Sequence, residues 1–77
     1  MSRITPVDWR TLVRVFEKFG CEVVRQKGSH IILRCPGAKR PIVIPRYDEI
    51  PVFVIKTNLR TAGMTREQYL ALLEEVR

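Results

Sequence analysis

The sequence predicts an α+β fold with the element order α-β-β-β-α-α, in which three strands form an antiparallel sheet. Three observations predict it. An amphipathic helical pattern comes first, two alternating apolar runs then flank the turn residues around Gly28, and two capped helical segments come last. A length of 77 residues leaves room for one domain over residues 1–77, with no internal repeat and no linker.

The first helix is predicted over residues 6–19. Thr5 is the expected N-cap, Pro6 suits the first helical position, and Asp8 lies near the positive end of the helix dipole. Gly20 is expected to end the helix. Apolar residues at helical spacing give the face that we expect to be buried, namely Trp9, Leu12, Val13 and Phe16.

A β-hairpin is predicted from Cys21 to Cys35, with its turn at residues 27–29. A turn centred on Gly28 gives the pairs Glu22–Arg34, Val23–Leu33, Val24–Ile32 and Gln26–His30, whereas a shift by one residue sets charged residues against apolar ones. The face toward the helices is then Cys21, Val23, Ile31, Leu33 and Cys35, and the polar face is Glu22, Gln26, His30 and Arg34. His30 is therefore expected to be accessible.

Residues 36–40 are predicted to form a turn, and residues 42–44, bracketed by prolines, a short third strand. Pro51 can open a second helix that runs to about Ala62 and ends at Gly63. Its inner residues are expected to be Ile55 and Leu59.

The last helix is predicted to start at a capping box formed by residues 65–68, Thr-Arg-Glu-Gln. Leu70, Leu73 and Val76 are expected to form its buried stripe.

The two cysteines, Cys21 and Cys35, are too few for a disulfide framework and lack zinc-ligand spacing, so we expect buried free thiols. The hairpin sets them opposite each other, where cross-strand Cβ atoms lie ~4.5–5.5 Å apart, so a bridge is geometrically possible. A reducing cytosol disfavours it. No apolar run approaches the ~18 residues of a membrane span, and the N-terminus lacks an apolar signal core. We expect a soluble, cytoplasmic protein.

The net charge of +6 is concentrated in the middle of the chain. Between Val23 and Tyr47 there is no acidic residue, and the basic residues there are Arg25, Lys27, Arg34, Lys39, Arg40 and Arg46. Acidic and basic residues balance elsewhere, so this stretch carries the whole surplus. Such asymmetry indicates a polyanionic partner, either nucleic acid or an acidic protein surface. A solvated basic loop region is the alternative.

Signatures of enzymes are few. The sequence has no Gly-rich phosphate loop, nucleophile elbow or metal-ligand cluster, so no metal and no cofactor is expected. Ser29 has no activating partner nearby in sequence. His30 is the only histidine, and a single histidine is more often a surface or packing residue than a catalyst. We interpret the aromatic residues Trp9, Phe16 and Phe19 as core rather than as a base-stacking platform.

Three further segments stand out: residues 16–30, FEKFGCEVVRQKGSH; IVIP at 42–45 followed by EIP at 49–51; and LRTAGMT at 59–65. They resemble the HicA (YcfA-like) family of mRNA-cleaving toxins, and the resemblance extends over about residues 7–74. Two places differ. Many members carry a lysine, and often a histidine, where residues 46–49 read RYDE, and members commonly have Gly-Thr where this chain has VFV at 52–54. We expect the Phe53 side chain to be exposed.

The resemblance implies a double-stranded-RNA-binding-domain-like fold, with the helices on one face of the sheet. It also implies a metal-independent endoribonuclease that cleaves mRNA and is neutralised by a HicB-like antitoxin. Carried over by position, the catalytic residue is His30, and Gly28 and Ser29 shape the turn that presents it. With the basic stretch, the expected RNA-binding residues are Arg25, Lys27, Gly28, Ser29, Arg34, Lys39, Arg40 and Arg46.

The hypothesis that follows is attack by a 2′-hydroxyl on the adjacent phosphorus, with the His30 imidazole taking the proton. Water, Lys27 or Arg34 would assist the leaving oxygen, and we expect slow turnover. Two other interpretations stay open: a non-catalytic RNA-binding module that uses the same basic face, and a small adaptor whose basic region binds an acidic protein.

Overall fold

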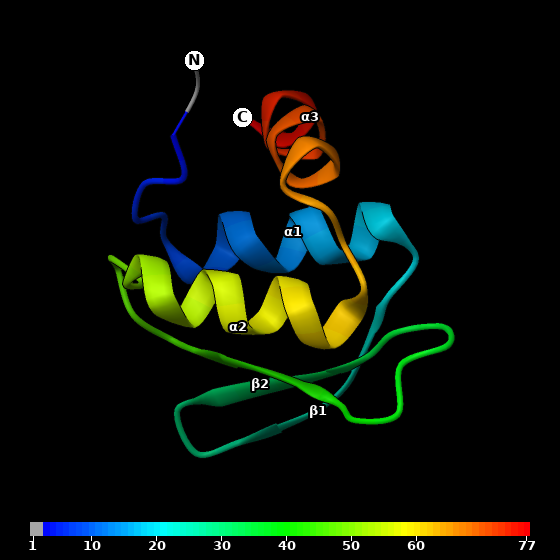
Figure 1. Ribbon diagram of the computed structural model, residues 1–77. Helices are drawn as coiled ribbons and strands as arrows, with labels where there is room; N and C mark the ends of the chain where they lie inside the picture. The colour runs from blue at the N-terminus through cyan, green and yellow to red at the C-terminus, as the bar shows by residue number, and fades with distance from the viewer. Residues whose placement is uncertain (1–2) are drawn as a thin grey trace.

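The computed structural model describes residues 3–77, and its elements follow the predicted order (Figure 1). They are α1 (Trp9–Phe19), β1 (Glu22–Lys27), β2 (His30–Arg34), β3 (Ile42–Pro45), α2 (Val52–Ala62) and α3 (Arg66–Val76). The strands form one antiparallel sheet in the spatial order β1-β2-β3. The α+β class and the arrangement expected of a double-stranded-RNA-binding-domain-like fold are thereby confirmed.

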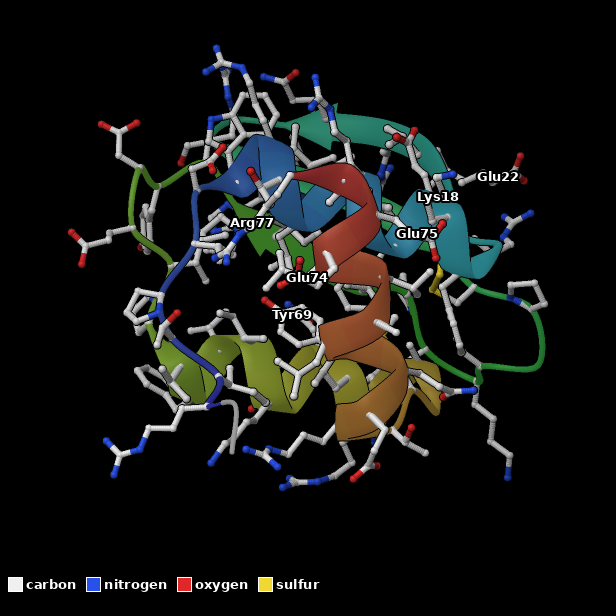
Figure 2. All side chains as sticks on the ribbon, turned by 90° about the horizontal axis from the view of Figure 1, so that it is seen from above. Lys18, Glu22, Tyr69, Glu74, Glu75 and Arg77 are labelled. Carbon is white, nitrogen blue, oxygen red and sulfur yellow. A yellow bond between two sulfur atoms is a disulfide. The ribbon has the colours of Figure 1, made fainter. Side chains whose placement is uncertain are left out.

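The elements form three layers. Helices α1 and α2 lie on the same face of the sheet, and α3 lies over them on the side away from the sheet (Figures 1 and 2). The largest fully buried side chains are Tyr69, Phe16, Leu12, Leu33, Ile42, Ile44, Ile50, Ile55 and Val15. No helix in residues 3–77 covers the other face of the sheet, which we call the outer face. None of the helices in this described part of the chain has the length and apolarity needed to cross a membrane.

Helix α1 begins later than predicted, because its N-cap is Asp8 and not Thr5. The Asp8 carboxylate accepts hydrogen bonds from the backbone N–H of Thr11 at 3.2 Å and from its hydroxyl at 2.6 Å. Chiefly because of the hydroxyl bond, the pKa of Asp8 lies below its ordinary value. Val7 has to stay extended, since its carbonyl accepts a hydrogen bond from the N–H of Ile50 at 2.8 Å.

The buried face of α1 is also shifted. Leu12 and Phe16 are buried as predicted, but Trp9 and Val13 are only partly buried, and Val15 is the third fully buried residue. The predicted C-terminal stop at Gly20 is confirmed, with φ of 112°.

The hairpin keeps the predicted register at its base and loses it at its turn. Glu22 pairs with Arg34 and Val23 with Leu33, as predicted, but a β-bulge at Val24 then shifts the register by one residue. The remaining pairs are Arg25–Ile32, Gln26–Ile31 and Lys27–His30. The predicted pairs Val24–Ile32 and Gln26–His30 are therefore wrong, and the turn holds two residues, Gly28 and Ser29, rather than three.

Gly28 accounts for the shorter turn. Its φ of 58° is the positive value that a two-residue type II′ hairpin requires at its first central position. Such turns match the twist of the flanking strands, and the bulge absorbs the extra residue. The new register takes Gln26 off the polar face. Val23 also departs from prediction: it is 43% exposed, because β1 is an edge strand.

Cys21 and Cys35 form a disulfide, which corrects the expectation of free thiols. Both residues are buried, and they lie directly outside the first cross-strand pair, Glu22–Arg34. The bond therefore closes the base of the hairpin, at the opposite end from His30.

The predictions for β3 and α2 hold, with β3 one residue longer at Pro45. Helix α2 starts after Pro51 and ends at Gly63, whose φ is 74°. Ile55 and Leu59 are buried as expected. Sequence reasoning missed Asn58, which is buried and donates a hydrogen bond to the carbonyl of Val43 at 3.1 Å. That bond joins α2 to the edge strand β3.

Helix α3 has the predicted capping box, in which the side chains of Thr65 and Gln68 each bond to the other residue's backbone. Its buried stripe was predicted only in part. Leu73 is buried, whereas Leu70 and Val76 are partly buried, and Tyr69 is fully buried. Figure 2 shows the Tyr69 ring between α1 and α2, which explains why this position replaces Leu70 as the main contact.

Candidate active site and nucleic-acid interface

His30 is the first residue of β2 and follows the two-residue turn directly. Because β2 is the central strand, His30 has a cross-strand neighbour on each side, Lys27 on β1 and Pro45 on β3. The side chain is exposed, as predicted, and within residues 3–77 its imidazole has no hydrogen-bond or ion-pair partner. A fixed backbone thus holds an imidazole that is open to an external ligand.

The turn before His30 is fixed by hydrogen bonds to both of its carbonyls. The Gln26 side-chain amide donates to the carbonyl of Gly28 at 3.3 Å, and the backbone N–H of Arg46 donates to the carbonyl of Ser29 at 2.8 Å. These bonds fix the backbone of the turn, whereas the residue type matters at Gly28 because of its positive φ. The second bond also brings the segment after β3 to the turn.

The indole of Trp9 holds two cations at this end of the sheet. The Arg46 guanidinium lies 4.9 Å from the centre of the Trp9 ring, and that of Arg10 lies 4.8 Å from it. The backbone N–H of Trp9 also donates to the carbonyl of Tyr47 at 3.0 Å. Cation–π contacts of this kind stabilise by about 0.5–1 kcal/mol at exposed sites and limit the motion of the guanidinium.

Sequence reasoning took Trp9 as a core residue and did not select Arg10. Trp9 is only partly buried, and two guanidinium groups lie over its ring. One signal for Arg10 was available: a basic residue in the first turn opposes the helix dipole, so it has no role in stabilising the helix end.

The other predicted cations meet on the outer face of the sheet. A hollow of about 450 Å³ is lined by Val24, Arg25, Ile32, Arg34, Ala38, Lys39, Arg40 and Pro41. We call it the sheet-face hollow. Four of the expected RNA-binding residues line it, although they come from three separate segments. Within residues 3–77, none of the four has an ion-pair partner.

The predicted basic surface is therefore divided into two groups. Lys27 and Arg46 lie at the turn end of the hairpin, beside His30, while the sheet-face hollow lies toward its base. His30 and Arg34 are four residues apart on β2, which corresponds to about 13 Å of extended chain.

Two other surface features are a charged hollow and an exposed aromatic side chain. A hollow of about 460 Å³ between α1 and α3 is lined by charges of both signs, including the ion pair between Lys18 and Glu75 at 3.6 Å (Figure 2). Phe53, at the start of α2, is 71% exposed, as predicted. Residues 3–77 contain no group of three or more His, Cys, Asp or Glu side chains that could hold a metal ion.

Comparison with known proteins identifies a family. The family model described as the HicA toxin of bacterial toxin-antitoxin matches residues 9–64, well over half of the chain. This range contains α1, the whole sheet, His30 and α2. No curated protein and no solved structure matches the chain.

Proposed function

The chain belongs to the HicA family of toxins of bacterial toxin–antitoxin systems, and on this basis we propose that it is a metal-independent endoribonuclease that cleaves mRNA, with His30 as its catalytic residue. The observation that carries the proposal is the position of the chain's only histidine. It is exposed on the central strand, next to a turn with fixed carbonyls and opposite a lysine.

The proposed reaction is an internal transesterification of the RNA. A 2′-hydroxyl attacks the adjacent phosphorus, and the bond from phosphorus to the 5′-oxygen of the next nucleotide breaks. The products are a 2′,3′-cyclic phosphate and a 5′-hydroxyl. Neutral His30 takes the proton of the attacking hydroxyl, which is the role that an imidazole fills best near neutral pH.

The leaving 5′-oxygen must receive a proton, and one histidine cannot donate and accept in the same step. The register favours Lys27 over Arg34 for this role, directly or through water, because Lys27 pairs with His30 while Arg34 is four residues away. Arg46, with its backbone tied to Ser29, is a second cation at this end. Fixed cations lower the energy of the charge that develops on the phosphate.

A toxin of such a system acts beside an inhibitor, and we propose a HicB-like antitoxin as the protein partner. Its carboxylates would face Arg25, Lys27, Arg34 and Arg40 and cover His30, and Phe53 offers an exposed apolar contact. Since mRNA is the proposed substrate, the proposed place of action is the cytoplasm.

The proposal is tested with His30→Ala and labelled RNA. The substitution changes an exposed strand residue, so the fold should be kept, with a stability change of about ±0.5 kcal/mol. Cleavage and growth arrest on induction should both be lost. A matched control is Lys56→Ala, an exposed substitution on α2, which should retain both activities.

Product ends and metal dependence separate this mechanism from a metal-ion nuclease. Cleavage should continue in EDTA and leave a 2′,3′-cyclic phosphate. If folded His30→Ala cleaves as fast as wild type, the assignment of His30 is wrong.

The second candidate function is a non-catalytic RNA-binding module. The observation that favours it is the sheet-face hollow, whose four cations lie away from His30 and can hold phosphates without chemistry. This function predicts that wild type and His30→Ala bind RNA equally and that neither cleaves it.

A further inference from the structure

The sheet-face hollow has features of a binding site that the proposed reaction does not use. It is concave, it has a volume of about 450 Å³, and β1, β2 and the segment after β2 all contribute to its lining. Four of its eight lining residues are cationic and none is acidic. The nearest carboxylate in the register is that of Glu22, which pairs with Arg34 across the strands without forming an ion pair within residues 3–77.

Four cations gathered without counter-charges add their fields over the hollow, which attracts an anion to it. Cross-strand pairing of Glu22 with Arg34 and of Arg25 with Ile32 sets the register here, which keeps the backbones of Arg25 and Arg34 in place. Guanidinium groups bind phosphate through paired N–H donors. The hollow therefore suits a phosphate group together with part of the sugar attached to it.

A path along the outer face joins the hollow to His30. The residues of β2 on this face are His30, Ile32 and Arg34, and Val43 of β3 pairs with Ile32. Val43 and Val24 are 41% and 42% exposed. Ile32 and Val24 also line the hollow, so a nucleic-acid strand lying along β2 would pass from His30 over Ile32 directly into it.

We propose that the sheet-face hollow is a second phosphate-binding subsite, which holds the backbone of single-stranded RNA two to four nucleotides from the bond cleaved at His30. The inference rests on the proposed function for the position of that bond. The spacing is that of Arg34, which is about 13 Å from His30 along β2, because a stacked strand advances about 3.4 Å per nucleotide and an extended strand advances more.

Single-stranded RNA is favoured over a duplex by the geometry of the reaction. The attacking 2′-oxygen must lie in line with the leaving 5′-oxygen, and regular A-form pairing holds the backbone away from that arrangement. The nucleotides next to the cleaved bond must therefore be free of pairing, and the hollow is close enough to bind the same unpaired segment.

The experiment measures binding in the His30→Ala background, so that it does not depend on cleavage. Oligouridylates of increasing length, from a dinucleotide to a decanucleotide, are titrated against three proteins. The parent is the His30→Ala variant. The hollow variant also carries Arg34→Gln and Lys39→Gln, and the control also carries Arg14→Gln and Lys56→Gln. The last pair removes the same charge from positions on α1 and α2, away from the hollow.

Affinity of the parent should rise in a step once an oligonucleotide is long enough to reach the hollow. In the Arg34/Lys39 variant the step should disappear, with about tenfold weaker binding of the long oligonucleotides. The slope of log affinity against log salt should become shallower by about 0.7 for each phosphate that the variant no longer neutralises. The Arg14/Lys56 control should keep both the step and the slope.

Several results would overturn the inference. One is equal binding by the hollow variant and the control at every length. Another is an equal loss at all lengths, the dinucleotide included, since that would reflect general charge or altered folding. If the hollow variant lost as much affinity for duplex RNA as for oligouridylate, the assignment to single-stranded RNA would be wrong. If it lost affinity for the antitoxin alone, the hollow would be a protein interface. Absence of cleavage by wild type would refute the proposed function and leave this measurement intact.

Discussion

Reduction of the Cys21–Cys35 disulfide should destabilise the protein strongly, and the structure sets the size of the effect. The sequence separation is 14, so the bond closes a loop that holds the entire hairpin. In the chain-entropy model a loop of this length contributes about 3 kcal/mol by restricting the unfolded chain. A domain of 77 residues has a total stability of about 4–12 kcal/mol, so reduction should remove a large fraction of it.

The assay is urea unfolding of protein purified without reductant, followed by circular dichroism with and without a phosphine reductant. With a urea dependence of about 1–2 kcal/mol per molar for a domain of this size, the midpoint should fall by roughly 1.5–3 M on reduction. The control is Cys21→Ala/Cys35→Ala, which should unfold at a lower concentration of urea and show no response to the reductant.

Two results would refute this reasoning. Titration of two free thiols in denatured protein that never met a reductant would mean that the bond does not form. An unchanged midpoint, although reduction has released both thiols, would mean that the loop entropy is offset in the folded state. In a reducing cytosol the pair would be thiols, and the lower stability would then apply.

Two further perturbations test the helix positions that the sequence placed incorrectly. Asp8→Ala should cost about 1 kcal/mol because it removes the N-cap of α1. Since the hydrogen bonds from Thr11 lower the pKa of Asp8 below 3.8, this contribution is fully present above that pH and is lost as the pH falls through the folded-state pKa. Urea midpoints of wild type and variant should therefore converge in acid, and a constant gap down to the lowest pH would contradict the capping role. Tyr69→Phe should leave the free energy of unfolding unchanged or raise it by about 1 kcal/mol, because the buried hydroxyl has no hydrogen-bond partner within residues 3–77. Burial raises the pKa of Tyr69, so wild type should lose stability relative to the variant as the pH rises above 10.0, and a clear loss of stability in Tyr69→Phe at neutral pH would show that the hydroxyl is satisfied.

Much of the fold follows from local signals in the sequence. The stops at Gly20 and Gly63 and the capping box at Thr65 were correct because each depends on the chemistry of a few adjacent residues. The start of α1 was wrong because Thr5 and Asp8 are both good N-caps, and the choice depends on a distant contact. Val7 pairs with Ile50, which keeps the backbone extended up to Asp8.

The candidate site was predictable in part. The exposure of His30 followed from alternation along one strand, and the basic stretch was visible in the sequence. The division of that stretch into two groups was not, because it depends on where the segment after β2 folds back. The contact of Trp9 with two arginines was also missed, since Arg46 reaches α1 only through the path of the chain after β3.

The bulge at Val24 links stability at the base of the hairpin to chemistry at its turn. The base register is held by the Glu22–Arg34 pair and the disulfide just outside it, while the turn register is set by Gly28. These two registers differ by one residue, and a regular hairpin can satisfy only one of them.

If the base register continued to the turn, Gln26 would stand opposite His30, as the sequence alone predicted. The extra residue instead brings Lys27 to that position, so that the imidazole has a cationic neighbour on the outer face. Bulges commonly redirect side chains next to active sites. In this chain the bulge lets one short hairpin keep its disulfide-closed base and still set a lysine opposite the proposed catalytic base.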